Sequence, residues 1–519
     1  MKRLVYWLFV AVVLMFCRTT PVQAAASNRV LLVYDSENLK ENGEQTIDSL
    51  SRTLASLNIT VTEEKFSTYR AGELARGHFR GVITLVNWHQ SRLTNPHFEK
   101  DRAAFTGKKL HIGQNLTAAE MQALGTAVTL THQQYTLVDP AQNSQQLIPF
   151  TSDQWPMFPA DKNSVGELVQ QSTGKHYAFG TISGHQAYLP AYRDTGLMGL
   201  LGTRLLAQFF IGQVTAQPPV LVLTGITPVS DLKLLKQTTR YLHAQGVPYA
   251  LSATMTAANP QLPEHAAYLR TLAQAQVAGA FIFLQVPEVY DPSAQTATIL
   301  QQQLNAQLAA AAQQGVFPGA ISAPGYWMFD QLFSQSLHQA DQNLLLANPT
   351  NYALNRYAPT NGYTPSLRTL IATPWTNFNA VSGSRQLTFA TPTAWTINLP
   401  TSKKTLQAFR QQVRQWTDQS WWSLSADPAV MTVRASQAIT VSAGQYTVAG
   451  RAVNVGEHVQ VKKTAAKTPQ TASQVNAFTR FQGNILLIFI IVALVILTIF
   501  LLYGRHIYRN QFRRKGRKP

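Results

Sequence analysis

The first hundred residues alternate between short apolar runs and a helix-spaced apolar pattern. Residues 30–34, 59–66, 81–87 and 109–113 read as strands, and residues 44–57 read as an amphipathic helix. This alternation is typical of a parallel sheet covered by helices. We therefore predict a doubly wound, flavodoxin-like α/β domain over residues 28–125.

The end of its first strand is a place where such folds bind ligands. This chain has Asp35 and Glu37 there, but neither a GxGxxG motif nor a Walker phosphate loop. The sequence gives nucleotide binding little support, and we interpret both acids as turn and cap residues.

Residues 126–215 are richer in Thr, Gln, Pro and aromatic residues, with short strand-like runs, and we interpret them as a β-rich connector. The glycine-rich apolar run 196–212 is short for a membrane span and has Arg204 near its middle. We predict a buried helix for this run.

The most regular pattern follows, with strand and helix signals recurring about every 30 residues. Strands are predicted at 220–223, 247–253, 278–284 and 317–323, and helices from Leu232, at 263–274 and at 296–314. This repetition predicts a parallel (βα) barrel-like domain over residues 216–384. Residues 385–461 read as a β-rich segment containing one helix at 404–416.

Both ends of the chain carry targeting signals. Residues 1–26 combine a basic start, an apolar run and small residues, the pattern of a secretory signal peptide. Residues 483–503 are uncharged and long enough for a transmembrane helix. A juxtamembrane stalk, 462–482, precedes this run and a basic tail, 504–519, follows it. We predict a single-pass cell-membrane protein with an extracellular body and a cytoplasmic tail.

Charge and cysteine content narrow the function further. The formal charge is +18, but residues 28–460 carry only about +4, because many bases lie near the termini. A nucleic-acid-binding surface is therefore not supported. The only cysteine, Cys17, lies in the signal peptide. The mature chain then has no disulfide, cysteine metal site or cysteine nucleophile.

Three sequence segments in the barrel region resemble those of a known protein family. They are VLVLTGITPVSDLKLLKQTTRYLHAQGVPY at 220–249, FIFLQVPEV at 281–289 and GVFPGAISAPGY at 315–326. In order and spacing they resemble the polysaccharide-deacetylase-like proteins of the DUF2334 group, which belong with the NodB-type carbohydrate esterases. The resemblance covers about a third of the chain. It implies a barrel whose strand ends hold a divalent metal that activates water.

The metal ligands implied by this resemblance are missing. The first strand ends in Thr224-Gly225 where an acid is expected, and LQVPE at 284–288 stands in place of a His-rich phrase. Ser322 and Gly325 stand where the last phrase should carry an acid and a histidine. We therefore assign no catalytic residue, metal or cofactor, and predict a pseudo-deacetylase.

Several residues near the predicted strand ends are candidates for a glycan-binding cleft, with Trp327 favoured as a stacking platform. They are Asp231, Glu288, Tyr326, Trp327 and Asp330. Two carboxylates at a suitable separation would also suffice for glycoside hydrolysis, for which Asp291 is a further candidate. Trp375, Trp395, Trp416 and the pair Trp421-Trp422 are alternative platforms, although core packing explains each of them as well.

The function expected from these features is binding or guiding a cell-surface or exopolysaccharide glycan beside a membrane glycosyltransferase or exporter. The expectation that the ligand is a carbohydrate rests only on the resemblance to the polysaccharide-deacetylase-like proteins. Two alternatives stay open. One is an active carbohydrate deacetylase or glycoside hydrolase, and the other is a structural assembly partner in a membrane complex. The sequence predicts no nucleic-acid partner.

Overall fold

A computed structural model of the chain describes residues 28–38, 43–88, 95–151, 154–212, 215–256, 262–287, 295–349, 368–459, 493–494 and 496–505. Two units are distinguished, residues 1–461 and 462–519, and each is considered by itself. The predicted signal peptide, the stalk and most of the predicted transmembrane helix lie outside the described residues.

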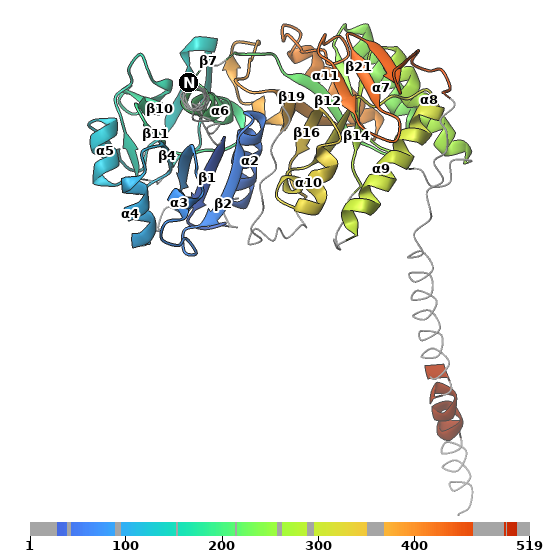
Figure 1. Cartoon of the computed structure of the whole chain (residues 1–519), viewed down its shortest axis with the longest axis horizontal. Coiled ribbons are helices and arrows are strands. Elements are labelled where there is room, and N and C mark those ends of the chain that lie inside the picture. Colours follow the sequence, from blue (N-terminus) through green and yellow to red (C-terminus); the bar gives the residue numbers. More distant parts are fainter. Residues whose placement is uncertain are drawn as a thin grey trace, which may run out of the picture. The chain divides into compact units, whose positions relative to one another are not determined.

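The N-terminal half of the first unit is built on one ten-stranded mixed sheet, confirming the α/β prediction (Figure 1). Its parallel part has the order β2-β1-β3-β4-β11. These strands are β1 (Arg29–Tyr34), β2 (Thr60–Lys65), β3 (Gly81–Leu85), β4 (Lys108–Ile112) and β11 (Gln186–Leu189). The helices are α2 (Gly43–Ser56), α3 (Glu73–Arg76), α4 (Pro96–Ala104), α5 (Ala118–Leu124) and α6 (Gly196–Phe210).

Strand β1 shows why the parallel strands appear as unbroken apolar runs. Val30 and Leu32 pack in the core that includes α2 and α6, whereas Leu31 and Val33 pack with residues of α3 and α4. Side chains alternate across a strand, so a sheet covered on both faces needs apolar residues at every position.

Residues 126–215, predicted as a separate connector, instead extend the same sheet by antiparallel pairing from β11. The added strands are β6 (Tyr135–Asp139), β7 (Ser144–Leu147), β9 (Val165–Gln170) and β10 (His176–Ser183). A separate pair is formed by β5 (Val128–Leu130) and β8 (Trp155–Met157). The predicted buried helix is α6, and its Arg204 binds the fully buried Asp139 in β6 at 2.7 and 2.6 Å.

The second half of the unit contains a closed barrel of seven parallel strands, confirming the predicted (βα) barrel-like domain (Figure 1). The strands are β12 (Val220–Ile226), β13 (Tyr249–Thr254), β14 (Phe281–Gln285), β15 (Ala320–Pro324), β16 (Gln342–Leu346), β17 (Arg368–Pro374) and β19 (Thr393–Asn398). The helices are α7 (Leu232–Ala244), α8 (Pro263–Val277), α9 (Thr296–Gln313), α10 (Gln331–Leu337) and α11 (Lys403–Gln415). Strand β19 closes the barrel against β12 and β17, so the barrel extends beyond residue 384.

A four-stranded antiparallel sheet lies across the amino ends of barrel strands. It comprises β20 (Met431–Val433), β21 (Ile439–Ser442), β22 (Gln445–Val448) and β23 (Arg451–Val453). The backbone N–H of Asp341, before β16, donates to the Thr432 carbonyl at 3.0 Å. Arg368, at the start of β17, binds Asp427 at 3.2 Å. The amino ends of these two strands are therefore covered, which leaves the carboxyl ends as the place to look for a barrel site.

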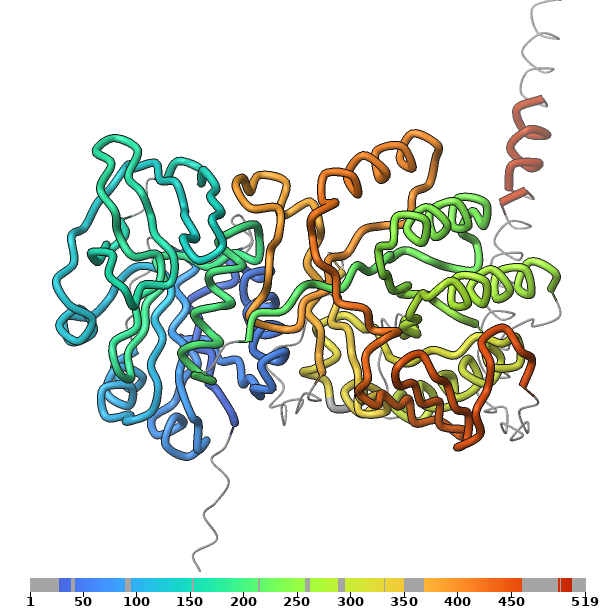
Figure 2. Tube along the Cα trace, turned by 90° about the horizontal axis from the view of Figure 1, so that it is seen from above, coloured from blue at the N-terminus to red at the C-terminus, as the bar shows by residue number. Residues whose placement is uncertain are grey.

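The connection between β17 and β19 joins the barrel to the N-terminal sheet. It contains only 3₁₀ turn η4 (Trp375–Phe378) and the short strand β18 (Ser382–Gly383), which pairs with β7. Figure 2 shows this orange segment beside the teal and green N-terminal half. Gln142 also donates to the Thr388 carbonyl at 3.1 Å. The two halves of this unit are thus linked by strand pairing as well as by side chains.

The second unit is described only in part. Residues 496–505 are helical and exposed. Among the helices for which positions are described, none is long and apolar enough to cross a membrane.

Candidate functional site

Neutral polar side chains lie inside the barrel and toward the carboxyl ends of its strands. Ser252 of β13 and Ser322 of β15 are both buried, and their hydroxyls lie 2.8 Å apart. The Ser252 hydroxyl also lies 3.3 Å from Gln285 Oε1 in the intervening strand β14. A contact between side chains two strands apart requires both to point into the barrel.

The first barrel strand ends in the same neutral chemistry. Thr224 Oγ1 donates to Oδ1 of the exposed Asn398 at 2.8 Å, linking β12 to β19. The pairing of β12 with β13 is irregular between Leu223 and Ile226, and Gly225 has φ of 71°. This positive φ suits glycine and explains the residue at that position. We call Thr224, Ser252, Gln285, Ser322 and Asn398 the barrel-mouth group.

The barrel-mouth group does not fit the metal that the deacetylase resemblance implies. Such a site needs carboxylate or imidazole ligands, whereas Thr224, Gln285 and Ser322 offer hydroxyls and an amide. At Gly325, a Cβ atom would lie 2.6 Å from Asp48 Oδ1 and 2.8 Å from Arg52 Cδ, leaving no space for a ligand side chain. No group of three His, Cys, Asp or Glu side chains suited to a metal occurs in the described part of the chain.

The two described acids of the predicted cleft serve as helix caps. Asp231 Oδ1 accepts hydrogen bonds from the backbone N–H groups of residues 233 and 234 at the start of α7. Asp330 Oδ1 accepts from those of residues 332 and 333 at the start of α10. These bonds are sufficient to explain both residues. Glu288 and Asp291 lie outside the described residues.

The predicted aromatic platforms lie mainly in the core. Trp327 is fully buried and stacks on Phe333 with ring centroids 4.9 Å apart, and Tyr326 is 2% exposed. Neither ring offers a free face to a sugar, which corrects the stacking role predicted for them. Trp375, Trp395 and Trp416 are also buried and belong to one aromatic cluster.

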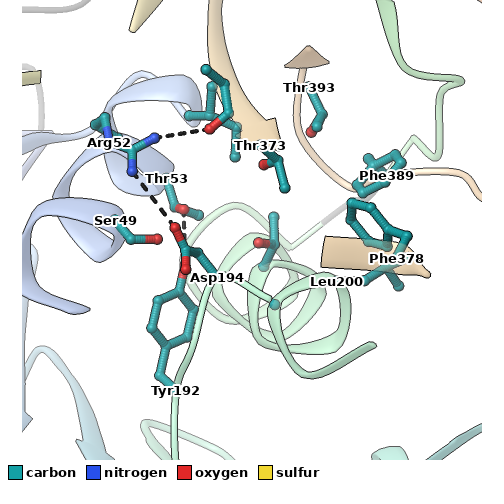
Figure 3. A pocket seen from close by; sticks show the side chains of 14 residues that line it. Ser49, Arg52, Thr53, Tyr192, Asp194, Leu200, Thr373, Phe378, Phe389 and Thr393 are labelled. Atoms are coloured by element: carbon teal, nitrogen blue, oxygen red, sulfur yellow. Dashed lines mark hydrogen bonds and ion pairs between the residues drawn. The ribbon is translucent and has the colours of Figure 1, made fainter. Parts of the chain in front are cut away.

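A charged network lies where α2 meets strand β17 (Figure 3). The Arg52 guanidinium donates to Asp48 Oδ2 at 2.9 Å and to the main-chain oxygen of Ala372 at 3.1 Å. Its third nitrogen lies 3.7 Å from Asp194 Oδ2. Burial acts to lower the pKa of Arg52, but Asp48 and Asp194 outweigh it and raise the pKa.

The cavity beside this network is too small for an organic ligand. Its volume is about 20 Å³, close to the space that one water molecule requires. Its walls include Ser49, Thr53, Tyr192 and Thr373, whose polar atoms suit a buried water. We interpret this place as a structural junction.

A larger cavity lies in the N-terminal domain, between helices α4 and α5 and one face of the sheet. Its volume of about 620 Å³ is within the usual range for small-molecule sites. Arg102 Nη1 lies 2.6 Å from Glu120 Oε1, which also lies 3.1 Å from His111 Nδ1. The three side chains are almost completely buried.

The surroundings of Glu120 keep its carboxylate ionised. The other oxygen accepts the Thr117 backbone N–H at 2.7 Å, completing a capping box at α5. Burial by itself would raise the pKa of Glu120, but His111, Arg102 and the Thr117 N–H together lower it well below its usual 4.5. Burial lowers the pKa of Arg102, and Glu120 offsets this effect only partly.

This geometry predicts an acid-sensitive contribution to stability. The folded-state pKa of Glu120 is depressed, so its stabilisation is present above the unfolded-state value and is lost as the pH falls below about 5. At neutral pH, Glu120→Gln should lower the free energy of unfolding by about 1.5–3 kcal/mol, the range for hydrogen bonds to charged groups. Urea unfolding at several pH values should show this deficit shrinking in acid.

Glu99→Gln provides the control, because Glu99 lines the same cavity but is exposed. It should follow the wild type at each pH. An undiminished Glu120→Gln deficit in acid would contradict the assigned role.

The two N-terminal acids, interpreted from the sequence as turn and cap residues, contact groups that follow or end neighbouring strands. The Asp35 carboxylate accepts the backbone N–H groups of Asn87 and Trp88 at 2.7 and 3.0 Å, across the point where the strand order reverses. Glu37 pairs with Lys65 at 3.1 Å.

Sequence reasoning missed the cavity of Arg102, His111 and Glu120. Two signals for it were present. Thr117 and Glu120 have capping-box spacing, and His111 interrupts an otherwise apolar strand end, KKLHI. No local sequence signal indicates that Arg102 of α4 lies beside His111 and Glu120.

Comparison with known proteins assigns no family to the chain. No protein-family model matches it, and no curated protein sequence is significantly similar. One solved structure with a distant match is phospho-2-dehydro-3-deoxyheptonate aldolase (DAHP synthase) from Thermotoga maritima, at 12% identity and a TM-score of 0.19. The match covers 32% of this chain and 47% of that enzyme. A likeness of this size says nothing about activity.

Proposed function

We propose that this protein is a membrane-anchored, non-catalytic extracellular protein that binds or guides a cell-surface or exopolysaccharide glycan. The observation supporting the barrel as the binding domain is the neutral hydroxyl and amide of Thr224 and Asn398 near the carboxyl ends of β12 and β19, of which Asn398 is exposed. Such groups pair with sugar hydroxyls without requiring a charge on the ligand. The carbohydrate assignment itself rests on the sequence resemblance.

The predicted transmembrane anchor would hold the glycan-binding domain at the cell membrane. The uncharged run 483–503 and its basic flank support insertion with the tail in the cytoplasm, and the signal-like residues 1–26 support export of the body. A glycan held at the barrel would then remain close to the bilayer, beside a membrane glycosyltransferase or exporter.

The first test uses the full chain in detergent with acetylated and deacetylated amino-sugar polymers. We expect saturable retention of polymer and no acetate release, with or without added zinc, nickel, cobalt or manganese. Asn398→Ala should weaken retention by about 2- to 10-fold, the effect of one neutral hydrogen bond. Asn398 is exposed, so the fold should tolerate this change.

Asn454→Ala is the matched control. Asn454 is also exposed and also makes a side-chain hydrogen bond, to Glu457 at 2.9 Å, but it follows β23. Retention by this variant should equal that of the wild type. Metal-dependent acetate release would overturn the non-catalytic assignment, and failure to retain any of the polymers would overturn the glycan assignment.

A further inference from the structure

A further cavity lies at the carboxyl ends of three parallel strands of the N-terminal sheet. Its walls contain residues that end or follow β3, β4 and β11, together with Thr46 of α2. Asn87, in this wall, binds Asp35 across the point where the strand order reverses, and open α/β sheets bind ligands at such points. The cavity volume is about 80 Å³, several times the roughly 10–15 Å³ that one water molecule requires. The space therefore suits a small molecule.

The Gln114 side chain is buried at this wall without a hydrogen-bond partner in the described part of the chain. The residue is only 9% exposed. Its amide oxygen and nitrogen are nevertheless not enclosed by protein atoms, so they face the cavity that the residue lines. Buried polar groups are rarely left unpaired, and a primary amide has donors as well as an acceptor to satisfy. The amide of Gln114 therefore calls for a polar partner inside the cavity.

Two further side chains give the cavity a charge and an acceptor. Arg193 is exposed, and among the described residues that line the cavity it is the charged one. Asn87 Nδ2 donates to the Ser36 carbonyl at 2.9 Å, which leaves Asn87 Oδ1 as an acceptor. The neighbouring Asp35 carboxylate already accepts the backbone N–H groups of residues 87 and 88. The cavity wall thus combines one cation with two amides and favours a ligand with a single negative charge.

We propose that the cavity lined by Asn87, Gln114 and Arg193 binds a small monovalent hydroxy acid, separately from the barrel and independently of the proposed glycan function. The ligand carboxylate accepts from the Arg193 guanidinium and from the Gln114 amide nitrogen, and the ligand hydroxyl donates to Asn87 Oδ1. A guanidinium presents parallel donors that match the two oxygens of a carboxylate. Because all three side chains line one small cavity, a single small ligand can reach them together.

The test follows binding of glycolate and lactate to the full chain in detergent by ligand-observed NMR, with lactamide and acetate as comparison probes. We expect saturable binding of at least one hydroxy acid in the millimolar range or tighter. Lactamide lacks the charge and acetate lacks the hydroxyl, so both should bind more weakly. Arg193→Gln should weaken binding of the hydroxy acid about 3- to 10-fold, and Gln114→Leu about 2- to 10-fold, as expected for loss of one hydrogen-bonding partner.

Arg240→Gln is the matched control, because Arg240 is also exposed but lies on α7 of the barrel, and this variant should bind like the wild type. Arg193→Gln changes an exposed position, so it tests the site even if the buried change Gln114→Leu prevents folding. The proposal is overturned if neither hydroxy acid binds, which would leave the cavity to water. It is also overturned if lactamide or acetate binds equally well, or if Arg193→Gln binds like the wild type.

Discussion

Replacing Arg52 by methionine should destabilise the chain by about 3–5 kcal/mol, the cost of removing one partner from a buried ion pair. Arg52 is 3% exposed, and its neighbour Asp48 is 5% exposed. The substitution leaves the Asp48 carboxylate without its cation and the Ala372 carbonyl without the donor that reaches it from α2. Urea unfolding followed by tryptophan fluorescence measures the loss.

A surface ion pair provides the control. Arg434 pairs with Asp341 at 2.5 Å, but the Arg434 side chain is 58% exposed. Arg434→Met should therefore cost no more than about 1 kcal/mol. Equal shifts in the unfolding midpoint for the two variants would contradict the buried-junction role of Arg52.

The double variant Asp48→Asn/Arg52→Met separates the ion pair from the junction as a whole. Removing both charges eliminates the unpaired carboxylate, so this variant should lose less stability than Arg52→Met alone. If the double variant is instead the less stable, Asp48 stabilises the fold through contacts other than its pair with Arg52, and the unpaired carboxylate is not the source of the Arg52→Met loss.

The elements of this fold were largely predictable because their signals are local. The apolar run predicted at 30–34 is β1 (Arg29–Tyr34), and the helix predicted at 296–314 is α9 (Thr296–Gln313). Both predictions depend on the spacing of apolar residues within a single strand or helix. Repeated strand and helix units then limit the barrel region to very few topologies.

Long-range pairing was not predictable in the same way. Strand β11 has the short sequence QAYL, yet it pairs in parallel with β4 and joins the predicted connector to the first domain. Strand β19 completes the barrel from a segment predicted to lie outside it. Neither pairing has a local sequence signal, because the partner strands are far away along the chain.

The candidate sites show the same division. Asp231 and Asp330 stand directly before helices, a local position that favours capping. The burial of Trp327 against Phe333 depends on how α10 returns onto the barrel, which composition does not reveal. The nearness of Arg102 to Glu120 depends on two helices meeting over one sheet face.

Trp395→Ala should be about as destabilising as the Arg52 change, at about 3–5 kcal/mol. Trp395 is fully buried in β19, the strand that closes the barrel. Its ring stacks on Phe378 at 4.8 Å and meets Trp416 edge-on at 4.9 Å. Truncation to alanine leaves a cavity among rigid rings that have little freedom to close it. The same urea unfolding measurement applies.

Two further variants distinguish cavity formation from loss of any tryptophan. Trp395→Phe keeps an aromatic ring, and the indole Nε1 it removes has no hydrogen-bond partner, so the loss should be clearly smaller. Trp88 is 48% exposed, and Trp88→Ala should change stability by no more than about 0.5 kcal/mol. A Trp395→Ala variant as stable as Trp88→Ala would show that the barrel closes without this ring.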